Sequence, residues 1–175
     1  TVKAAMLRDE CPREKSFGEV VEKVCNGILQ IYPGGVENYE CIPFAASGTG
    51  GVEAMLSSIP KDNEILVIKR GSYGERMSQI LSYIDDVYHY NYDGFGQDGR
   101  LSESKFSKKF VSFVRSLGKI SHLALVHHET STGFIEKFED ICMYKAITGA
   151  RVYVDMISAY GGVSDIDLTH RFAPD

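Results

Sequence analysis

The chain has 175 residues, of which 43% are hydrophobic and 25% are charged, and its formal net charge is −5. This length and apolar content suit one globular domain with a real core, and two large domains would need a longer chain. The acidic balance and the lack of a basic stripe argue against nucleic acid as a partner. No apolar run approaches the roughly 18 residues of a membrane span, so we expect no membrane partner either.

The cysteine pattern gives a prediction about the compartment. The four cysteines have no close ligand spacing: Cys11, Cys25, Cys41 and Cys142. We interpret them as reduced thiols and expect a cytoplasmic protein, because disulfides are rare there. The opening residues "TVKAAMLRDE" also lack the apolar core of a secretory signal. Because the first residue is Thr rather than Met, we expect that a segment upstream is missing.

Helical and strand-like spacings of apolar residues follow one another along the chain. In chain order they predict a helix over 17–32, a strand over 39–46, a helix over 50–59, a strand over 64–70, a helix over 75–84, a strand over 86–92, a glycine-containing loop, a helix over 102–117, a strand over 121–129, a helix over 138–148 and a strand over 151–155. Pro43 indicates that the first strand is an edge or irregular. Such alternation predicts an α/β fold with three layers, in which helices cover both faces of a mostly parallel sheet.

In sheets of this kind, ligands bind beyond the carboxyl ends of the strands, so the turns from strand to helix are the places to search. The first such turn is "AASGTGGVEA" (45–54). Ser47, Gly48 and Thr49 open a helix there, and free backbone N–H groups with two hydroxyls could hold a phosphate. The turn is neither a Walker A sequence nor the dinucleotide glycine fingerprint, and a plain tight turn with a helix cap fits it equally well.

The second turn is "KRGSYGERM" (69–77), in which Tyr73 stands between Gly71 and Gly74 just past a strand. A ring in this position could lie flat on a planar ligand. The alternative is a tyrosine that only packs at the start of a helix.

The third turn is "VHHETSTGF" (126–134), where Glu129 and Thr130 begin a cluster of hydroxyls with one acid. His127 and His128 invite a metal interpretation, but adjacent strand residues point to opposite faces. No third ligand stands at useful spacing, so we predict no metal site. A Ser-His-Asp hydrolase is also disfavoured, because the G-x-S-x-G elbow is missing.

The fourth turn follows "ARVYVD", an apolar strand that carries a single acid, Asp155, at its end. Burying a lone carboxylate costs several kcal/mol unless it is paired. Asp155 could cap the following turn, or it could face a protonated heterocyclic nitrogen and hold the proton there. Together the four turns would supply a phosphate cradle, a stacking ring, a polar flank and a carboxylate, which suits a flat, phosphorylated pyridine.

In this combination the motifs resemble a known family, the class V aminotransferases of the fold-type I pyridoxal 5'-phosphate (PLP) enzymes. The resemblance covers "TVKAAMLRDECPRE", "SGTGGVEAML", "GSYGERM", "HHETSTGF" and "VDMISAYGGVSDID", in order and along nearly the whole chain. It is greatest to the branch that transfers an amino group from 2-aminoethylphosphonate to pyruvate. The resemblance implies that residues 1–175 are part of the large cofactor-binding domain, with an N-terminal segment and a C-terminal small domain outside them.

The resemblance also implies a set of cofactor-binding residues: Ser47, Gly48, Thr49, Tyr73, Thr130 and Asp155. The first three match the turn that binds the cofactor phosphate, and Tyr73 matches the aromatic position that stacks on the pyridine ring. Thr130 matches a hydroxyl position near the phenolic side of the ring. Asp155 matches the aspartate that pairs with the pyridinium nitrogen, which is both a binding and a catalytic role.

One feature of the family is missing from these residues. The family's lysine that bonds the cofactor lies well beyond the aspartate, in the next strand-to-helix turn, whereas the last lysine here is Lys145. We therefore expect a piece of a longer polypeptide, inactive as it stands, and the resemblance implies a homodimer for the parent. The alternatives are an alanine–glyoxylate or serine–pyruvate transaminase, and an inactive relative that binds the cofactor or serves in assembly. A doubly wound nucleotide-binding protein is disfavoured by the missing glycine fingerprint.

Overall fold

The computed structural model describes residues 2–7, 9–84, 87–91, 103–163 and 165–175. The described chain divides into two compact units, residues 1–44 with 167–169, and residues 45–166 with 170–175. The ends of the predicted strand 86–92, the first residue of the predicted helix 102–117, and the glycine loop between them lie outside the described residues. No helix in the described ranges is long and apolar enough to cross a membrane.

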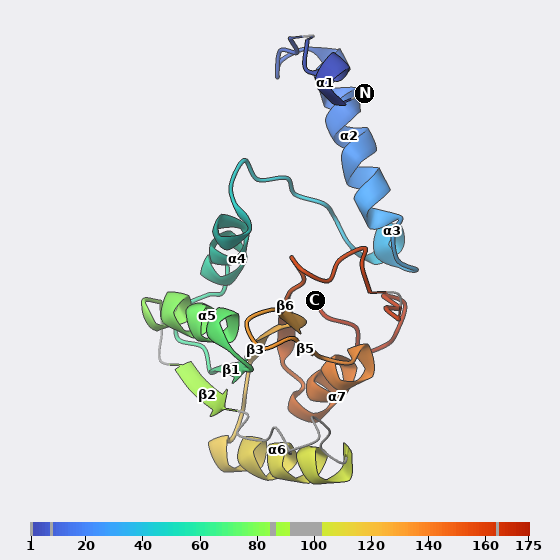
Figure 1. Cartoon of the computed structure of the whole chain (residues 1–175). Helices are drawn as coiled ribbons and strands as arrows, with labels where there is room; N and C mark the ends of the chain where they lie inside the picture. The colour runs from blue at the N-terminus through green and yellow to red at the C-terminus, as the bar shows by residue number, and fades with distance from the viewer. Residues whose placement is uncertain (1, 8, 85–86, 92–102, 164) are drawn as a thin grey trace. The chain divides into compact units, whose positions relative to one another are not determined.

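The first unit consists mainly of helix α2 (Lys15–Leu29), with the short helices α1 (Val2–Ala5) and α3 (Gly35–Asn38) (Figure 1). Helix α2 confirms the first predicted helix. The segment 167–169 joins this unit because the Leu168 N–H donates a hydrogen bond to the Pro33 carbonyl at 2.9 Å. Gly34 has a φ of +82° and lies so close to Leu168 that a side chain would not fit.

The prediction of a strand over residues 39–46 is wrong. This segment has no regular secondary structure, and Ile42 and Phe44 are 73% and 60% exposed. A strand forms only where a neighbour accepts and donates its backbone hydrogen bonds, and no described strand pairs with it. Pro43 also removes one of the N–H groups that such pairing would need.

A four-stranded sheet forms the centre of the second unit. Its strands are β1 (Ile65–Lys69), β2 (Val87–Asn91), β3 (His122–Val126) and β6 (Arg151–Asp155), in the order β2-β1-β3-β6. Every neighbouring pair is parallel, and Val126 at the end of β3 lies opposite Asp155 at the end of β6. The carboxyl ends therefore meet at one edge of the sheet.

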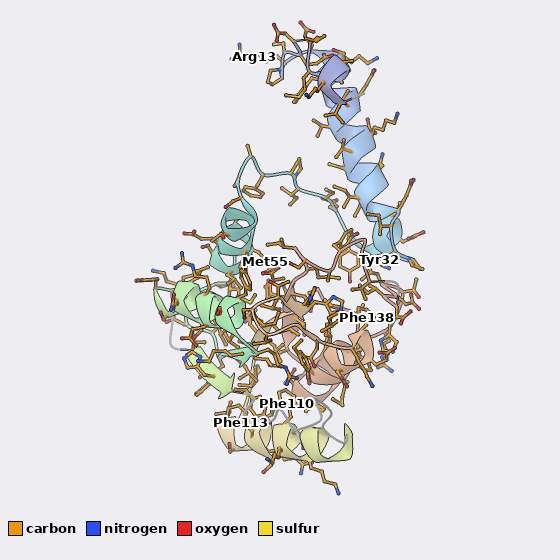
Figure 2. The ribbon with its side chains drawn as sticks, in the orientation of Figure 1. Arg13, Tyr32, Met55, Phe110, Phe113 and Phe138 are labelled. Carbon is orange, nitrogen blue, oxygen red and sulfur yellow. The ribbon has the colours of Figure 1, made fainter. Side chains whose placement is uncertain are left out.

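Helices cover both faces of this sheet, which confirms the predicted three-layer α/β fold. Helices α4 (Gly48–Ser57) and α5 (Ser72–Ser82) pack on the face that carries Ile65 and Val67 of β1. Helices α6 (Glu103–Leu117) and α7 (Phe138–Thr148) pack on the opposite face (Figure 1). Figure 2 shows Phe110 and Phe113 on the side of α6 that faces the sheet, where Phe110 is fully buried.

The predicted strand over residues 121–129 is divided in two. Strand β3 ends at Val126, and a bend at His127 separates it from the short strand β4 (His128–Glu129). Strand β4 pairs antiparallel with β5 (Phe134–Ile135). Periodicity does not reveal strands of two residues. This small hairpin holds the loop 130–133 beside the start of α5, where the Ser72 N–H donates to the Ser131 hydroxyl at 2.9 Å.

Candidate functional site

A cleft of about 240 Å³ lies where α4 and α5 begin, beyond the carboxyl ends of β3 and β6. Four of the six residues predicted to bind a ligand line it: Gly48, Thr49, Tyr73 and Asp155. Its remaining walls include the apolar side chains of Val52, Met77, Ile80 and Val126. The cleft is in the place that a parallel sheet predicts for a ligand site.

Helix α4 presents its N-terminus to the cleft. Ser47 is the N-cap residue, and its hydroxyl accepts a hydrogen bond from the Gly50 N–H at 3.5 Å. Ser47 does not line the cleft, so the helix-cap alternative is correct for its hydroxyl, and its contact with a ligand stays a prediction. The first N–H groups of a helix carry partial positive charge and favour an anion.

Gly48 allows the start of α4 to lie close to the segment that follows β6. A Cβ atom at this position would be 2.7 Å from Cδ1 of Ile157, which also lines the cleft. A side chain there would compete with Ile157 for the same space, so glycine keeps this end of the cleft open.

The start of α5 is held by a carboxylate from the β4–β5 hairpin. Glu129 is fully buried and accepts hydrogen bonds from the Gly74 N–H at 3.0 Å and the Tyr73 N–H at 3.3 Å. The Ser131 hydroxyl donates to the same carboxylate. These bonds satisfy N–H groups that a helix start leaves free, and they place Tyr73 on the wall of the cleft with half of its surface exposed.

A buried ion pair lies next to the β4–β5 hairpin. The Arg70 guanidinium makes two hydrogen bonds to Glu136, at 2.9 and 3.0 Å, and lies 4.4 Å from the ring centre of Phe134. The Tyr144 hydroxyl donates to the same carboxylate at 2.6 Å. Such a bidentate pair fixes the geometry of both side chains, so Arg70 has a structural role.

Asp155 is 9% exposed, and it reaches the cleft from the end of β6. Its Oδ1 accepts a hydrogen bond from the Ile157 N–H at 2.9 Å, so the capping alternative from the sequence is correct for this oxygen. Burial raises the pKa of the Asp155 carboxyl, and the nearby Glu129 raises it further, while the Ile157 N–H lowers it. No ion pair to Asp155 exists within the described ranges, so a cation or a strong donor from a ligand would stabilise its charged form.

The two adjacent histidines lie in different surroundings. His128 lines the cleft, and its Nδ1 is 3.2 Å from the Ser158 carbonyl oxygen. His127 is buried, and neither of its ring nitrogens has a hydrogen-bond partner in the described part of the chain. Burial lowers the pKa of His127. Sequence reasoning considered His128 only as a metal ligand and missed it as part of the cleft wall.

Thr130 was predicted from the sequence as a binding residue, whereas Arg76 was not. Thr130 is exposed in the turn after β4 and does not line the cleft, so its contact with a ligand stays a prediction. Arg76 lines the cleft although no motif singled it out. The available signal was its spacing, because Arg76 stands three residues after Tyr73 on the same helix, and such residues share one face.

Comparisons with known proteins concern the chain as a whole. No protein-family model matches the chain. It is 32% identical over 167 residues to the 2-aminoethylphosphonate–pyruvate transaminase of Phocaeicola vulgatus, an alignment that covers 93% of this chain and 44% of that protein. The same enzyme of Syntrophobacter fumaroxidans is 32% identical over 164 residues, covering 93% and 42% of the two chains.

Solved structures share the fold. Ureidoglycine–glyoxylate aminotransferase from Bacillus subtilis superposes with a TM-score of 0.69 at 20% identity, over 95% of this chain and 41% of that one. Pyridoxamine–pyruvate aminotransferase from Mesorhizobium loti gives a TM-score of 0.74 at 16% identity, over 91% and 38%. The resemblance to aminotransferases is confirmed. The chain spans less than half the length of the curated relatives that it matches.

Proposed function

We propose that this chain is the cofactor-binding part of a PLP-dependent aminotransferase that transfers the amino group of 2-aminoethylphosphonate to pyruvate. The products would be phosphonoacetaldehyde and alanine. The observation that carries the proposal is the cleft, in which a helix N-terminus, a half-exposed tyrosine and a buried carboxylate meet. The names of the relatives support the choice of substrates.

The residues of the cleft fit this cofactor in three respects. The N-terminus of α4 suits a phosphate, and Gly48 leaves the space that a side chain would fill. The Tyr73 ring suits one face of a pyridine. Asp155 is nine-tenths buried without an ion-pair partner in the described structure, which suits a protonated ring nitrogen.

When bound, PLP supplies an electron sink for the charge that remains when the donor's Cα–H bond breaks. The protein's own residues prepare that chemistry. The backbone of Gly48 and Thr49 would bind the phosphate, and Tyr73 would orient the ring. Asp155 would hold a proton on the ring nitrogen, because a carboxylate at that atom favours the charged form. Met77 and Ile80 exclude water from this wall of the cleft.

Three further properties belong to the same proposal. The parent would be a homodimer and a cytoplasmic protein, and residues 1–175 would form part of its large domain. The support is the resemblance of the motifs, together with relatives more than twice as long as the matched region.

The test is an assay of alanine formation from pyruvate by the full-length polypeptide that contains this chain. We expect alanine when 2-aminoethylphosphonate is the donor, and a loss of about 100-fold or more in kcat for Asp155→Ala. Comparable rates with serine, or amination of glyoxylate by alanine, would favour the related transaminases instead. No amino transfer from any of these donors would contradict the proposal.

A further inference from the structure

We propose that Arg76 binds the phosphoryl dianion of the ligand in the cleft, beside the N-terminus of α4. This inference rests on the proposed function, because it concerns the same site. The anion could be the phosphate of the cofactor or the phosphonate of the amino donor, which share a tetrahedral phosphorus centre with charged oxygens.

The position of Arg76 follows from the packing of α5. Tyr73, Arg76, Met77 and Ile80 all line the cleft, and their spacing of three, four and seven residues puts them on one face of the helix. Met77 is 1% exposed, which fixes the rotation of α5 about its axis. Arg76 therefore stands one turn beyond Tyr73 on the wall that faces the cleft.

The charges around Arg76 leave its guanidinium available. Within the described ranges no ion pair or hydrogen bond to Arg76 occurs, although its neighbour Glu75 pairs with Lys69 at 2.9 Å. Arg70, the preceding arginine, is buried and bound to Glu136. Among the described residues that line the cleft, Arg76 is the one permanent cation, and Asp155 is the one acid.

A phosphoryl dianion needs this cation. The N-terminus of α4 offers backbone N–H groups and about half of one elementary charge, which only partly balances a dianion. A guanidinium adds a full charge and a planar pair of donors that matches two phosphate oxygens. Asp155 repels an anion, so the phosphoryl group belongs at the opposite side of the cleft, toward α4 and Arg76.

The experiment compares two ligands that differ only in the phosphate. Binding of PLP and of pyridoxal to the full-length protein would be measured by absorbance and fluorescence, for the wild type, Arg76→Gln and Arg76→Lys. The matched control is Arg115→Gln, an exposed arginine on α6, on the other face of the sheet. Pyridoxal binding also reports whether each variant is folded.

We expect Arg76→Gln to weaken PLP binding about tenfold or more while pyridoxal binding is unchanged, with Arg76→Lys intermediate and the control like the wild type. A second arm measures the ratio of KM for 2-aminoethylphosphonate to KM for alanine in the wild type and in Arg76→Gln. If this KM ratio shifts while the ratio of PLP affinity to pyridoxal affinity does not, Arg76 binds the donor's phosphonate. If neither ratio shifts, Arg76 binds no phosphoryl group and the inference is wrong. A wild type that binds neither pyridoxal compound overturns the proposed function itself.

Discussion

At the scale of single residues, Asp155 is a buried carboxylate at the end of β6 that lacks an ion-pair partner among the described residues. One oxygen is satisfied by the turn that follows β6, and the side chain still reaches the cleft. The hydrogen bond lowers the pKa of Asp155, but burial raises it more. The charged form is therefore costly until a ligand supplies the missing cation.

This cost gives a prediction for the chain without cofactor. The pKa of Asp155 in the folded chain is above its value in the unfolded chain, which is near 3.9, so the folded state binds the proton more tightly. The free energy of unfolding therefore falls as the pH rises from the unfolded pKa to the folded pKa. Asp155→Asn keeps the acceptor for the Ile157 N–H and removes the charge. We expect this variant to be more stable than the wild type at pH 7, by about 1 kcal/mol, and nearly equal to it at pH 3.5.

Urea unfolding of both chains at the two pH values measures this difference. A variant that is less stable than the wild type at pH 7 would contradict the account of Asp155. An equal difference at both pH values would contradict it as well, because the effect must follow the ionisation.

At the scale of elements, the helices and central strands could be predicted because each carries its own pattern. The strand Arg151–Asp155 and the helix Phe138–Thr148 have the predicted bounds. The start of α5 could not be predicted, since its N–H groups bind Glu129, 55 residues further along the chain from Gly74. The segment 39–46 failed for a related reason, because a strand depends on a partner that local sequence does not contain.

The contact between the hairpin and α5 gives a prediction about Gly71. A Cβ atom at Gly71 would lie 2.7 Å from Cγ of Glu129, a buried side chain that has no space to move away. We expect Gly71→Ala to destabilise the chain by about 1–3 kcal/mol and to displace Tyr73 from the cleft. Thermal unfolding measures the first effect, and ligand binding measures the second.

Gly51→Ala is the matched control. Gly51 lies inside α4, where nothing stands within 4 Å of an added Cβ atom, so alanine should raise helix stability by up to about 1 kcal/mol. If both variants behave alike, the close approach of the hairpin to Gly71 does not matter.

At the scale of the whole molecule, the parallel sheet is what made the site predictable. Turns that are far apart in sequence meet at the carboxyl edge, so the strand-to-helix pattern is enough to group Tyr73, after β1, with Asp155, at the end of β6. Gly48 also lines the cleft, but the strand predicted before it does not form, so the pattern does not explain its position. Arg76 and His128 were missed because arginines and histidines are common in sequences, and no local pattern marks these two as residues of a binding site. Only the rotation of α5 and the break of the strand at His127 bring them to the cleft.

The central claim is that Asp155 holds a proton on the ring nitrogen of bound PLP, and one measurement tests it most directly. Nitrogen-15 NMR of PLP labelled at the ring nitrogen, bound to the full-length protein, reports the protonation of that atom. The account predicts a nitrogen that stays protonated to higher pH than in free PLP, and a loss of this effect in Asp155→Ala. A deprotonated nitrogen in the wild type at neutral pH, or the same titration in both proteins, would contradict it.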